Sequence, residues 1–411
     1  MASEKLRPPH APRRATFPAV VAFPLLVCAL PAFSEVTEVD ERAARVHEEA
    51  IVVDGHNDIP TFILDYGFDL GMDGADPAKR DATWYWIPGA RWLLPDPVGE
   101  ELRTDTDLAR LRAGGVDAQF FSVFAHSSYE GRAAHDRATQ MLDAMQAQIR
   151  RHSEHLELAT RADDVLRITR AGRIAALLGL EGGHAIASDL DHLREFHHRG
   201  IRYMTLTWSN TNAWADSSTD EARHGGLADF GRQVVREMNR LGMLVDLSHV
   251  SDATFYDALE VTKAPAILSH SSCRALVDHP RNVSDPMLRA LAANGGVIMI
   301  TFVEHYVDQA KAGIWPSVRH FLTNLGWEDT PFEAVLDHID HAVRVAGVDH
   351  VGLGSDFDGT LFLPEGLKEV SDFPHLTAAL LARGHSEQDV AKILGGNVLR
   401  ILAEAEARAG R

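Results

Sequence analysis

Cysteine is nearly absent from this sequence, which has two, Cys28 and Cys273, among 411 residues. If the N-terminal residues are removed as a leader, Cys273 is left alone and no intramolecular disulfide can form. Disulfides are allowed but not required in an exported protein, so an oxidising compartment is compatible with this chain.

Positive charge is also scarce. Acidic residues number 59 and basic residues 40, which gives a formal net charge of −19. A protein that binds nucleic acid neutralises phosphates with a clustered basic face, and the sequence contains no such cluster. We therefore exclude a nucleic-acid partner.

The N-terminal apolar run is too short for an ordinary membrane span. It covers residues 17–30, against the roughly 20 residues that a bilayer requires, and Pro18 and Pro24 interrupt it. Basic residues precede the run, and small residues follow it at the spacing of a cleavage site. We predict that residues 1–34 are a signal peptide and that the protein is exported, as a periplasmic or secreted protein. The alternative is an uncleaved N-terminal anchor, through which the protein would associate with a membrane.

No internal repeat or low-complexity linker divides residues 40–408, so we predict a single domain over residues 35–411. Short apolar runs alternate with stretches in which apolar residues recur at three- and four-residue spacing, as at 227–241 and 332–346. The runs predict eight strands, at residues 51–53, 118–124, 174–180, 202–207, 243–247, 266–269, 297–302 and 350–354.

Strands that are apolar throughout are typically buried on both faces, and helical connections between them require parallel pairing. Eight such units favour a closed α/β barrel of the (β/α)8 TIM type, with an open sheet as the alternative. Ser251 and Ser284 stand where helix N-caps are expected. Residues 62–115, rich in Gly, Asp, Pro and Trp, depart from the pattern, and we interpret them as an insertion after the first strand, over the mouth of the barrel.

Residues able to bind metal follow the first and third predicted strands. His56 and Asp58 come just after the first strand, and in extended backbone residues i and i+2 project to the same face, so both can reach one ion. A polar turn is the alternative interpretation. Glu181 follows the third strand directly, before two glycines, so its two oxygens could bridge a pair of cations. An acid at the start of a helix is the alternative there.

The fifth and sixth strands both end in Ser-His, at His249 and His270. A single such histidine is more often a core or loop residue than a ligand, but two at equivalent positions favour metal binding. Asp356 follows the eighth strand, where barrel enzymes place catalytic groups, and Asp358 is the alternative acid.

These side chains offer imidazole and carboxylate donors without a thiolate, which suits zinc, manganese, iron or cobalt. Five ligands exceed what one tetrahedral ion with an open position needs, and two ions bridged by Glu181 account for the number. Two ions about 3.5–4 Å apart can hold a hydroxide between them and polarise a carbonyl oxygen. The pattern therefore predicts a metal-dependent hydrolase.

The motifs extend over nearly the whole chain after the leader. They are Asp54-Gly55-His56-Asn57-Asp58, Glu181-Gly182-Gly183-His184, residues 202–207, Leu247-Ser248-His249, residues 268–272, Arg281-Asn282-Val283, residues 352–359 and Gly395-Gly396-Asn397. In this order they resemble the membrane dipeptidase (renal dipeptidase) family of zinc peptidases, which has an amidohydrolase-like barrel. The resemblance implies that His56, Asp58 and Glu181 hold one zinc ion, and that Glu181, His249 and His270 hold the other.

The resemblance also implies roles toward a substrate. Asp356 would manage the proton between the bridging water and the leaving amine. Arg281 would clamp the free carboxylate of a dipeptide, a role that suits its rigid fork of donors. The family cleaves dipeptides, tolerates D-residues at the C-terminal position and in some members opens β-lactam rings. Dimers are common in it, so a homodimer is a further expectation.

Two positions depart from the family pattern. Trp208 stands where the family usually carries a histidine that contacts the substrate and stabilises the tetrahedral intermediate. Indole offers one N–H donor and no charge, so this stabilisation would be altered or come from elsewhere, with His184 nearby in the motifs. Val303 stands where a substrate-side tyrosine is expected.

We therefore predict a zinc-dependent dipeptidase that attacks the peptide bond of dipeptides with a metal-bridging hydroxide. The alternative, which Trp208 keeps open, is a related amidohydrolase acting on a lactam, a lactone or an N-acyl amino acid. A third hypothesis is an exported binding protein that has lost the chemistry; the intact ligand set and Asp356 argue against it.

Overall fold

The computed structural model describes residues 33–75, 80–81, 102–314 and 328–410. Nearly all of the predicted leader and part of the predicted insertion lie outside these ranges. The strands are β1 (Val53–Asn57), β2 (Arg80–Asp81), β3 (Leu102–Arg103), β4 (Ala118–Phe124), β5 (Leu156–Leu158), β6 (Ile174–Glu181), β7 (Ile201–Thr205), β8 (Leu244–Asp246), β9 (Ile267–Ser271), β10 (Val297–Ile300) and β11 (Val351–Leu353).

The α-helices vary from one turn to about five turns. They are α1 (Phe33–Glu49), α2 (Ile59–Tyr66), α3 (Leu108–Ala113), α4 (Arg132–Arg151), α5 (Ala162–Arg170), α6 (Leu190–His198), α7 (Asp229–Leu241), α8 (Asp252–Val261), α9 (Asp285–Ala293), α10 (Glu304–Val307), α12 (Glu333–Ala346), α13 (Phe373–Ala382), α14 (Glu387–Ala391) and α15 (Asn397–Arg408). Shorter turns are the 3₁₀ helices η4 (Gly183–Ile186), η5 (Val348–His350) and η6 (Val370–Asp372) and the π-helical turn η7 (Lys392–Gly396).

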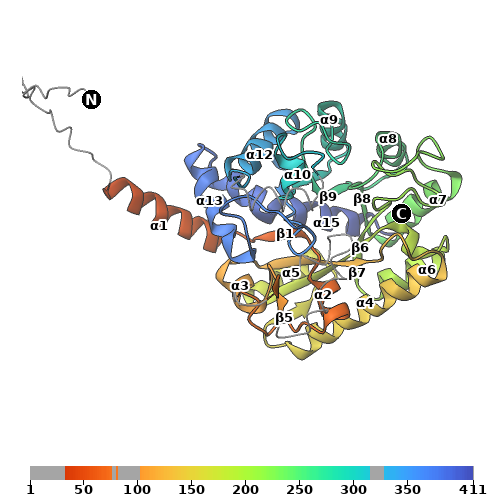
Figure 1. Cartoon of the computed structure of the whole chain (residues 1–411), viewed down its shortest axis with the longest axis horizontal. Coiled ribbons are helices and arrows are strands. Elements are labelled where there is room, and N and C mark those ends of the chain that lie inside the picture. The colour runs from red at the N-terminus through yellow and green to blue at the C-terminus, as the bar shows by residue number, and fades with distance from the viewer. Residues whose placement is uncertain (1–32, 76–79, 82–101, 315–327, 411) are drawn as a thin grey trace, which may run out of the picture.

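Eight parallel strands form a closed barrel. Their order is β4-β1-β11-β10-β9-β8-β7-β6, and pairing between β4 and β6 closes the ring. β5 adds to β6 as a further parallel strand. Helices surround the barrel, and α1 projects away from it (Figure 1). The predicted (β/α)8 barrel is confirmed.

The strands are buried on both faces because apolar side chains alternate between two clusters. Along β6, Ala175 and Leu177 belong to a cluster inside the barrel, whereas Leu178 and Leu180 pack with the outer helices. Side chains alternate between the two faces along a strand, so Glu181 lies on the same inner face as Ala175 and Leu177, at the carboxyl end of β6.

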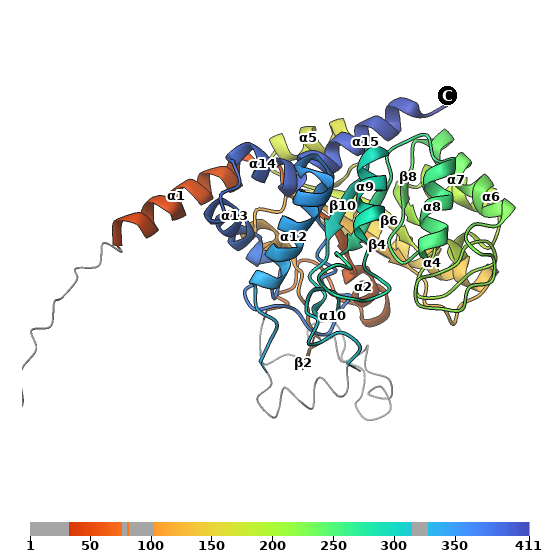
Figure 2. The same cartoon turned by 90° about the horizontal axis from the view of Figure 1, so that it is seen from above.

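The last helix closes the opposite end of the barrel. Val398, Ile401, Leu402 and Ala405 of α15 join the inner cluster of strand residues. In Figure 2, α15 lies on one side of the barrel, while α2 and α10 lie on the other. Because α2 and α10 follow the carboxyl ends of β1 and β10, the mouth is on their side.

The predicted strands recur with shifted bounds. Residues 118–124 match β4, but the first strand is Val53–Asn57 instead of residues 51–53. That strand continues through polar residues because Asp54 pairs with Leu353 and Asn57 with Phe121. His56 therefore lies within β1 and not after it. Apolar patterns also failed to predict β5.

The predicted helix N-caps lie where expected. Ser251 is the N-cap of α8, and its side chain accepts a hydrogen bond from the backbone N–H of Thr254. Ser284 is the N-cap of α9, without a side-chain capping bond.

The described part of the insertion reaches the site end of the barrel. It holds α2, the two-stranded sheet of β2 and β3, and α3. The backbone N–H of Asp105 donates to Asp358 at 2.8 Å, and Asn57 donates to the hydroxyl of Thr106 at 2.7 Å. Residues 76–79 and 82–101 of the insertion lie outside the described residues.

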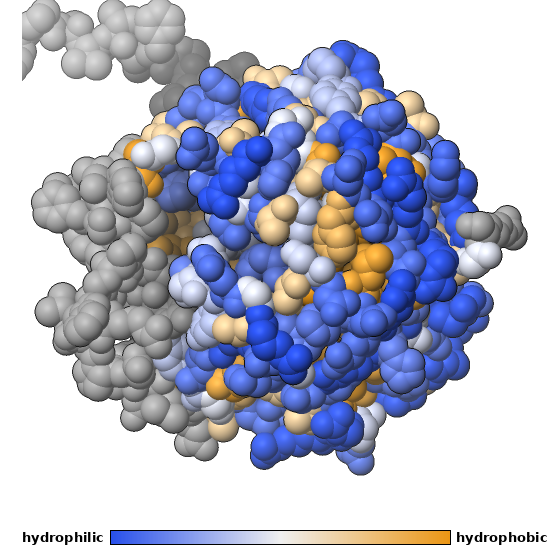
Figure 3. Space-filling view, turned by 90° about the vertical axis from the view of Figure 1, so that its right-hand side faces the viewer, coloured by the Kyte–Doolittle hydropathy of each residue, from blue (hydrophilic) through white to orange (hydrophobic). Residues whose placement is uncertain are grey.

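The face shown in Figure 3 is hydrophilic over most of its area, and its apolar side chains form small groups between polar ones. Among the described residues, no helix has the length and apolar character needed to cross a membrane.

Candidate active site

The barrel brings all five predicted metal ligands to its mouth. His56 belongs to β1 and Asp58 follows it, Glu181 ends β6, and His270 belongs to β9. His249 follows β8. All five side chains are buried, none more than 7% exposed.

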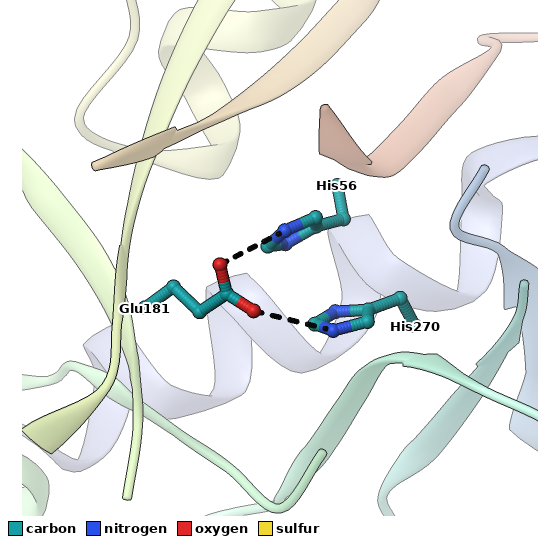
Figure 4. Close-up of side chains that lie close together, drawn as sticks. All are labelled: His56, Glu181 and His270. Atoms are coloured by element: carbon teal, nitrogen blue, oxygen red, sulfur yellow. Dashed lines mark ion pairs between the residues drawn. The ribbon is translucent and has the colours of Figure 1, made fainter. Parts of the chain in front are cut away.

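Glu181 lies at the centre of this cluster. Its Oε2 is 3.6 Å from Nε2 of His56, while its Oε1 is 3.0 Å from Nε2 of His249 and 3.5 Å from Nε2 of His270. Figure 4 shows one carboxylate oxygen directed to His56 and the other to His270. The two oxygens of Glu181 thus face different histidines, as a bridging carboxylate requires.

Asp58 and Asp356 complete the His56 side of the cluster. Nε2 of His56 is 3.4 Å from Oδ2 of Asp58 and 4.0 Å from Oδ1 of Asp356. These three residues form one group able to hold a cation, and His56, Glu181 and His270 form another. Asp356 therefore lies where it could act as a ligand as well as an acid/base.

Left-handed backbone conformations direct some of these side chains. His249 has φ of 67°, Asp356 of 65° and Asp358 of 62°. Non-glycine residues seldom adopt such angles, and strain of this kind gathers at functional sites. Asp358 itself accepts a hydrogen bond from Asp105, so Asp356 is the acid that faces the cluster.

Tyr203 of β7 supports His56 from inside the barrel, a contact that sequence reasoning missed. Its hydroxyl is 2.8 Å from Nδ1 of His56. Gly179 of β6 leaves room for the ring, because a Cβ there would lie 2.1 Å from Cζ of Tyr203. A glycine inside an otherwise apolar strand was the available signal, since it indicates close approach by a neighbour.

Burial and neighbouring charges shift the pKa values of Glu181 and Asp356 in opposite directions. Burial raises the pKa of Glu181, but His56 and His249 outweigh it, so this pKa lies well below its usual value. Burial raises the pKa of Asp356 well above its usual value, and Asp58 and Glu181 add to the rise against the opposing effect of His56. A carboxyl group whose pKa is raised in this way takes up a proton more readily than an ordinary carboxylate, which suits acid/base chemistry.

The residues fit a cation. Nε2 of His56 and Oδ1 of Asp58 are buried and have no hydrogen-bond partner among the described residues. Unpaired buried polar atoms are costly, and an ion would satisfy both. The donor set of imidazole and carboxylate groups is one that zinc and related metals accept.

Arg281 lies beside the cluster, and two of its guanidinium nitrogens are available to bind a substrate group. It is 3% exposed, and its Nη2 donates to the carbonyl oxygen of His270 at 3.1 Å. Its Nε and Nη1 are buried without a hydrogen-bond partner in the described part of the chain. Its guanidinium carbon lies 5.3 Å from the ring centre of Tyr306, three residues beyond Val303. Nothing in the sequence pattern indicated Tyr306.

Trp208 lies at the edge of the cluster. Its ring centre is 6.5 Å from that of His249, 4.8 Å from Phe124 and 5.2 Å from His126. His184 lies nearby, and its Nε2 is engaged with the carbonyl oxygen of Ala125 at 2.8 Å. Trp208 is thus a neighbour of the predicted ligand His249, and His184 is hydrogen-bonded within the protein.

Comparisons with known proteins identify the family of this chain. The model of the membrane dipeptidase family (peptidase family M19) matches residues 40–411. Dipeptidase tcpJ of Claviceps purpurea is 38% identical over 404 residues, covering 94% of this chain and 86% of that protein. Dipeptidase verJ of Clonostachys rogersoniana is 37% identical over 376 residues, covering 89% and 87%.

Solved structures show the same fold. A metallo peptidase from Rhodobacter sphaeroides, liganded with a phosphinate mimic of the dipeptide L-Ala-D-Ala, is 26% identical with a TM-score of 0.69 and covers 87% of this chain and 100% of its own. The probable dipeptidase PvdM from Pseudomonas aeruginosa is 24% identical with a TM-score of 0.74, covering 91% and 100%. The chain therefore belongs to the membrane dipeptidase family of peptidases.

Proposed function

We propose that this protein is a zinc-dependent dipeptidase with a binuclear centre. The observation that carries the proposal is the placement of Glu181, whose two oxygens face His56 on one side and the pair of His249 and His270 on the other. His56, Asp58 and Glu181 would hold one ion, and Glu181, His249 and His270 the second. Two such ions supply an activated water and polarise the scissile carbonyl.

The protein's own side chains would orient the dipeptide and move its protons. The free donors of Arg281 would take the C-terminal carboxylate and so fix the peptide bond over the cluster. Asp356 would accept the proton of the attacking water and pass it to the leaving amine. The raised pKa of Asp356 supports this role, because the group must carry a proton between two steps.

The buried clamp would select the last peptide bond of a substrate. Arg281 is almost inaccessible and touches the backbone of His270, so a carboxylate that reaches it comes from the residue next to the scissile bond. The solved metallo peptidase from Rhodobacter sphaeroides was liganded with a mimic of L-Ala-D-Ala, which supports the inclusion of D-residues at the C-terminal position.

The test is metal analysis joined to a hydrolysis panel. The purified protein should contain about two zinc ions per chain and release amino acids from dipeptides, including those ending in a D-residue, but not from tripeptides. Chelation should abolish the activity and zinc should restore it. A broad panel without metal-dependent turnover would end the dipeptidase proposal.

Trp208 favours a second candidate, hydrolysis of a lactam, a lactone or an N-acyl amino acid at the same centre. The indole beside His249 offers a single neutral donor, so stabilisation of a peptide-derived oxyanion differs from the family pattern. A parallel screen of these acyl substrates separates the candidates by kcat/KM.

We also propose that the protein is exported. The support is the basic and then apolar character of residues 1–34. Expression of the full chain followed by N-terminal mass analysis of the exported protein tests this. Retention of residue 1 on an exported, membrane-bound protein would show an anchor in place of a cleaved signal.

A further inference from the structure

Two buried aspartates hold strand ends of the site in the same way. Asp246 of β8 accepts hydrogen bonds from the backbone N–H and the hydroxyl of Ser269, at 3.0 and 2.6 Å. Asp54 of β1 accepts the same two bonds from Ser355, at 2.8 and 2.6 Å. Each serine lies on the neighbouring strand or directly after it, and each precedes a residue of the site.

The two serines differ in what their hydroxyls contact next. Oγ of Ser269 is 2.8 Å from Nδ1 of His270. The hydroxyl has one hydrogen and donates it to Asp246, since a carboxylate accepts. Ser269 therefore accepts from His270, which places the imidazole proton on Nδ1. Nε2 of His270 is left with its lone pair directed at Glu181.

The same hydrogen-bond argument assigns the tautomer of His56 but not that of His249. The hydroxyl of Tyr203 donates to the carbonyl oxygen of Gly55 at 3.2 Å, so it accepts from Nδ1 of His56. Nδ1 of His249 is buried and has no hydrogen-bond partner among the described residues. Acceptors at Nδ1 therefore select the tautomer of His56 and His270. His249 has no such acceptor at Nδ1, and its Nε2 lies 2.9 Å from Nε2 of His270 and 3.0 Å from Oε1 of Glu181.

We propose that Asp246, acting through Ser269, is the positioning residue that sets cation affinity in the half of the site formed by Glu181, His249 and His270. The pair holds His270 in the tautomer and orientation that an ion requires. Outer partners of this kind contribute roughly 10–100-fold to metal affinity. That half depends on His270 because His249 lacks a comparable partner. The proposal rests on the proposed function for the identity of the ion, zinc.

Additional bonds keep Asp246 in place without the serine hydroxyl. The backbone N–H of Ser248 donates to Asp246 at 3.0 Å, and the hydroxyl of Thr205 donates at 2.5 Å. Replacing Ser269 by alanine therefore removes the link to His270 and leaves the carboxylate bonded to three donors. Ser355→Ala is the matched control, because it removes an equally short hydroxyl–carboxylate bond. The Ser355 hydroxyl lies 3.1 Å from the backbone carbonyl oxygen of His56 and, unlike that of Ser269, is bonded to no imidazole nitrogen.

The experiment titrates zinc into the metal-free full chain against a chelating indicator. Wild type should bind two ions, and Ser269→Ala should bind one of them roughly 10–100-fold more weakly. Ser355→Ala should bind both ions as wild type does, although both variants should lose similar thermal stability. Ser269→Thr keeps the hydroxyl and should restore most of the lost affinity.

Wild-type affinity for both ions in Ser269→Ala would overturn the proposal, as would an equal loss in Ser355→Ala. If Ser269→Ala does not fold, ¹⁵N spectra of the metal-free wild type decide: a proton on Nδ1 of His270 supports the proposal and a proton on Nε2 overturns it. A wild type that binds two ions but cleaves no dipeptide ends the proposed function alone. One that binds no zinc ends both.

Discussion

Oδ1 of Asp356 lies 4.0 Å from Nε2 of His56, the same nitrogen that Oε2 of Glu181 approaches to 3.6 Å. This position allows either a proton-transferring acid or a further ligand. Asp356→Asn separates the two roles because the amide cannot carry the proton. We expect turnover to fall by about 10²–10⁴-fold with both metals retained.

Metal content and steady-state kinetics on the same preparation check that prediction. Asp358→Asn is the control, since Asp358 is engaged with Asp105 and should affect turnover less. Loss of one metal from Asp356→Asn would make Asp356 a ligand, and undiminished turnover would remove it from the mechanism.

Arg281 should discriminate between a dipeptide and its C-terminal amide. Charge-assisted bonds to a carboxylate contribute about 1.5–3 kcal/mol, so wild type should favour the free acid by roughly 10–100-fold in kcat/KM. Arg281→Met should weaken hydrolysis of the acid and leave the amide nearly unchanged, which brings the ratio close to one. A variant that keeps the wild-type ratio would place carboxylate recognition elsewhere.

Trp208→His should raise dipeptide turnover if the indole limits oxyanion stabilisation. A single well-placed donor contributes about 10²–10³-fold in kcat, which is the upper limit of the gain. Trp208→Phe keeps an aromatic ring beside Phe124 and should give no gain. Equal rates in the two variants would show that the donor at this position is irrelevant to peptide cleavage.

The convergence of the five candidate ligands could be predicted because each lies at or near the carboxyl end of a strand. In a parallel barrel those ends converge, so chain position alone brought His56, Glu181 and His270 together. The closed eight-strand order followed from the alternation of apolar runs with helical patterns.

The supporting contacts could not be predicted in this way. Whether Tyr203 meets His56, or Ser269 meets Asp246, depends on which side chains of neighbouring strands face each other. Irregular register, as between Asp54 and Asn57 of β1, decides this and leaves little trace in a single sequence.

Glu237 should make stability depend on pH in the acid range. Its carboxylate accepts bonds from Arg240 of its own helix α7 and from Arg194 of α6, at 2.7 and 2.6 Å. These bonds outweigh burial and lower its pKa from 4.5 to about 2. A depressed folded-state pKa adds stability above the unfolded value, and the gain is lost as the pH falls from 4.5 toward 2.

The unfolding temperature of wild type should therefore drop more steeply than that of Glu237→Gln on acidification through this range. Thermal unfolding of both proteins across the range, at matched ionic strength, measures the difference. Parallel curves would mean that the ion pairs between α6 and α7 contribute no pH-dependent stability.

Gly359→Ala should disrupt metal binding by His56 and Asp58 without affecting the half of the site formed by His249 and His270. A Cβ at this position would lie 2.1 Å from Oδ2 of Asp58 and 2.4 Å from Oδ1 of Asp356, closer than real Cβ contacts allow. Both carboxylates must move, so we expect weaker binding of one zinc ion and at least a 10-fold loss of turnover. Gly396→Ala is the control, because its Cβ would meet nothing closer than the carbonyl oxygen of Ala391 at 3.3 Å. Zinc titration of both variants decides the matter: two ions bound at wild-type affinity in Gly359→Ala would show that Asp58 does not hold the first ion.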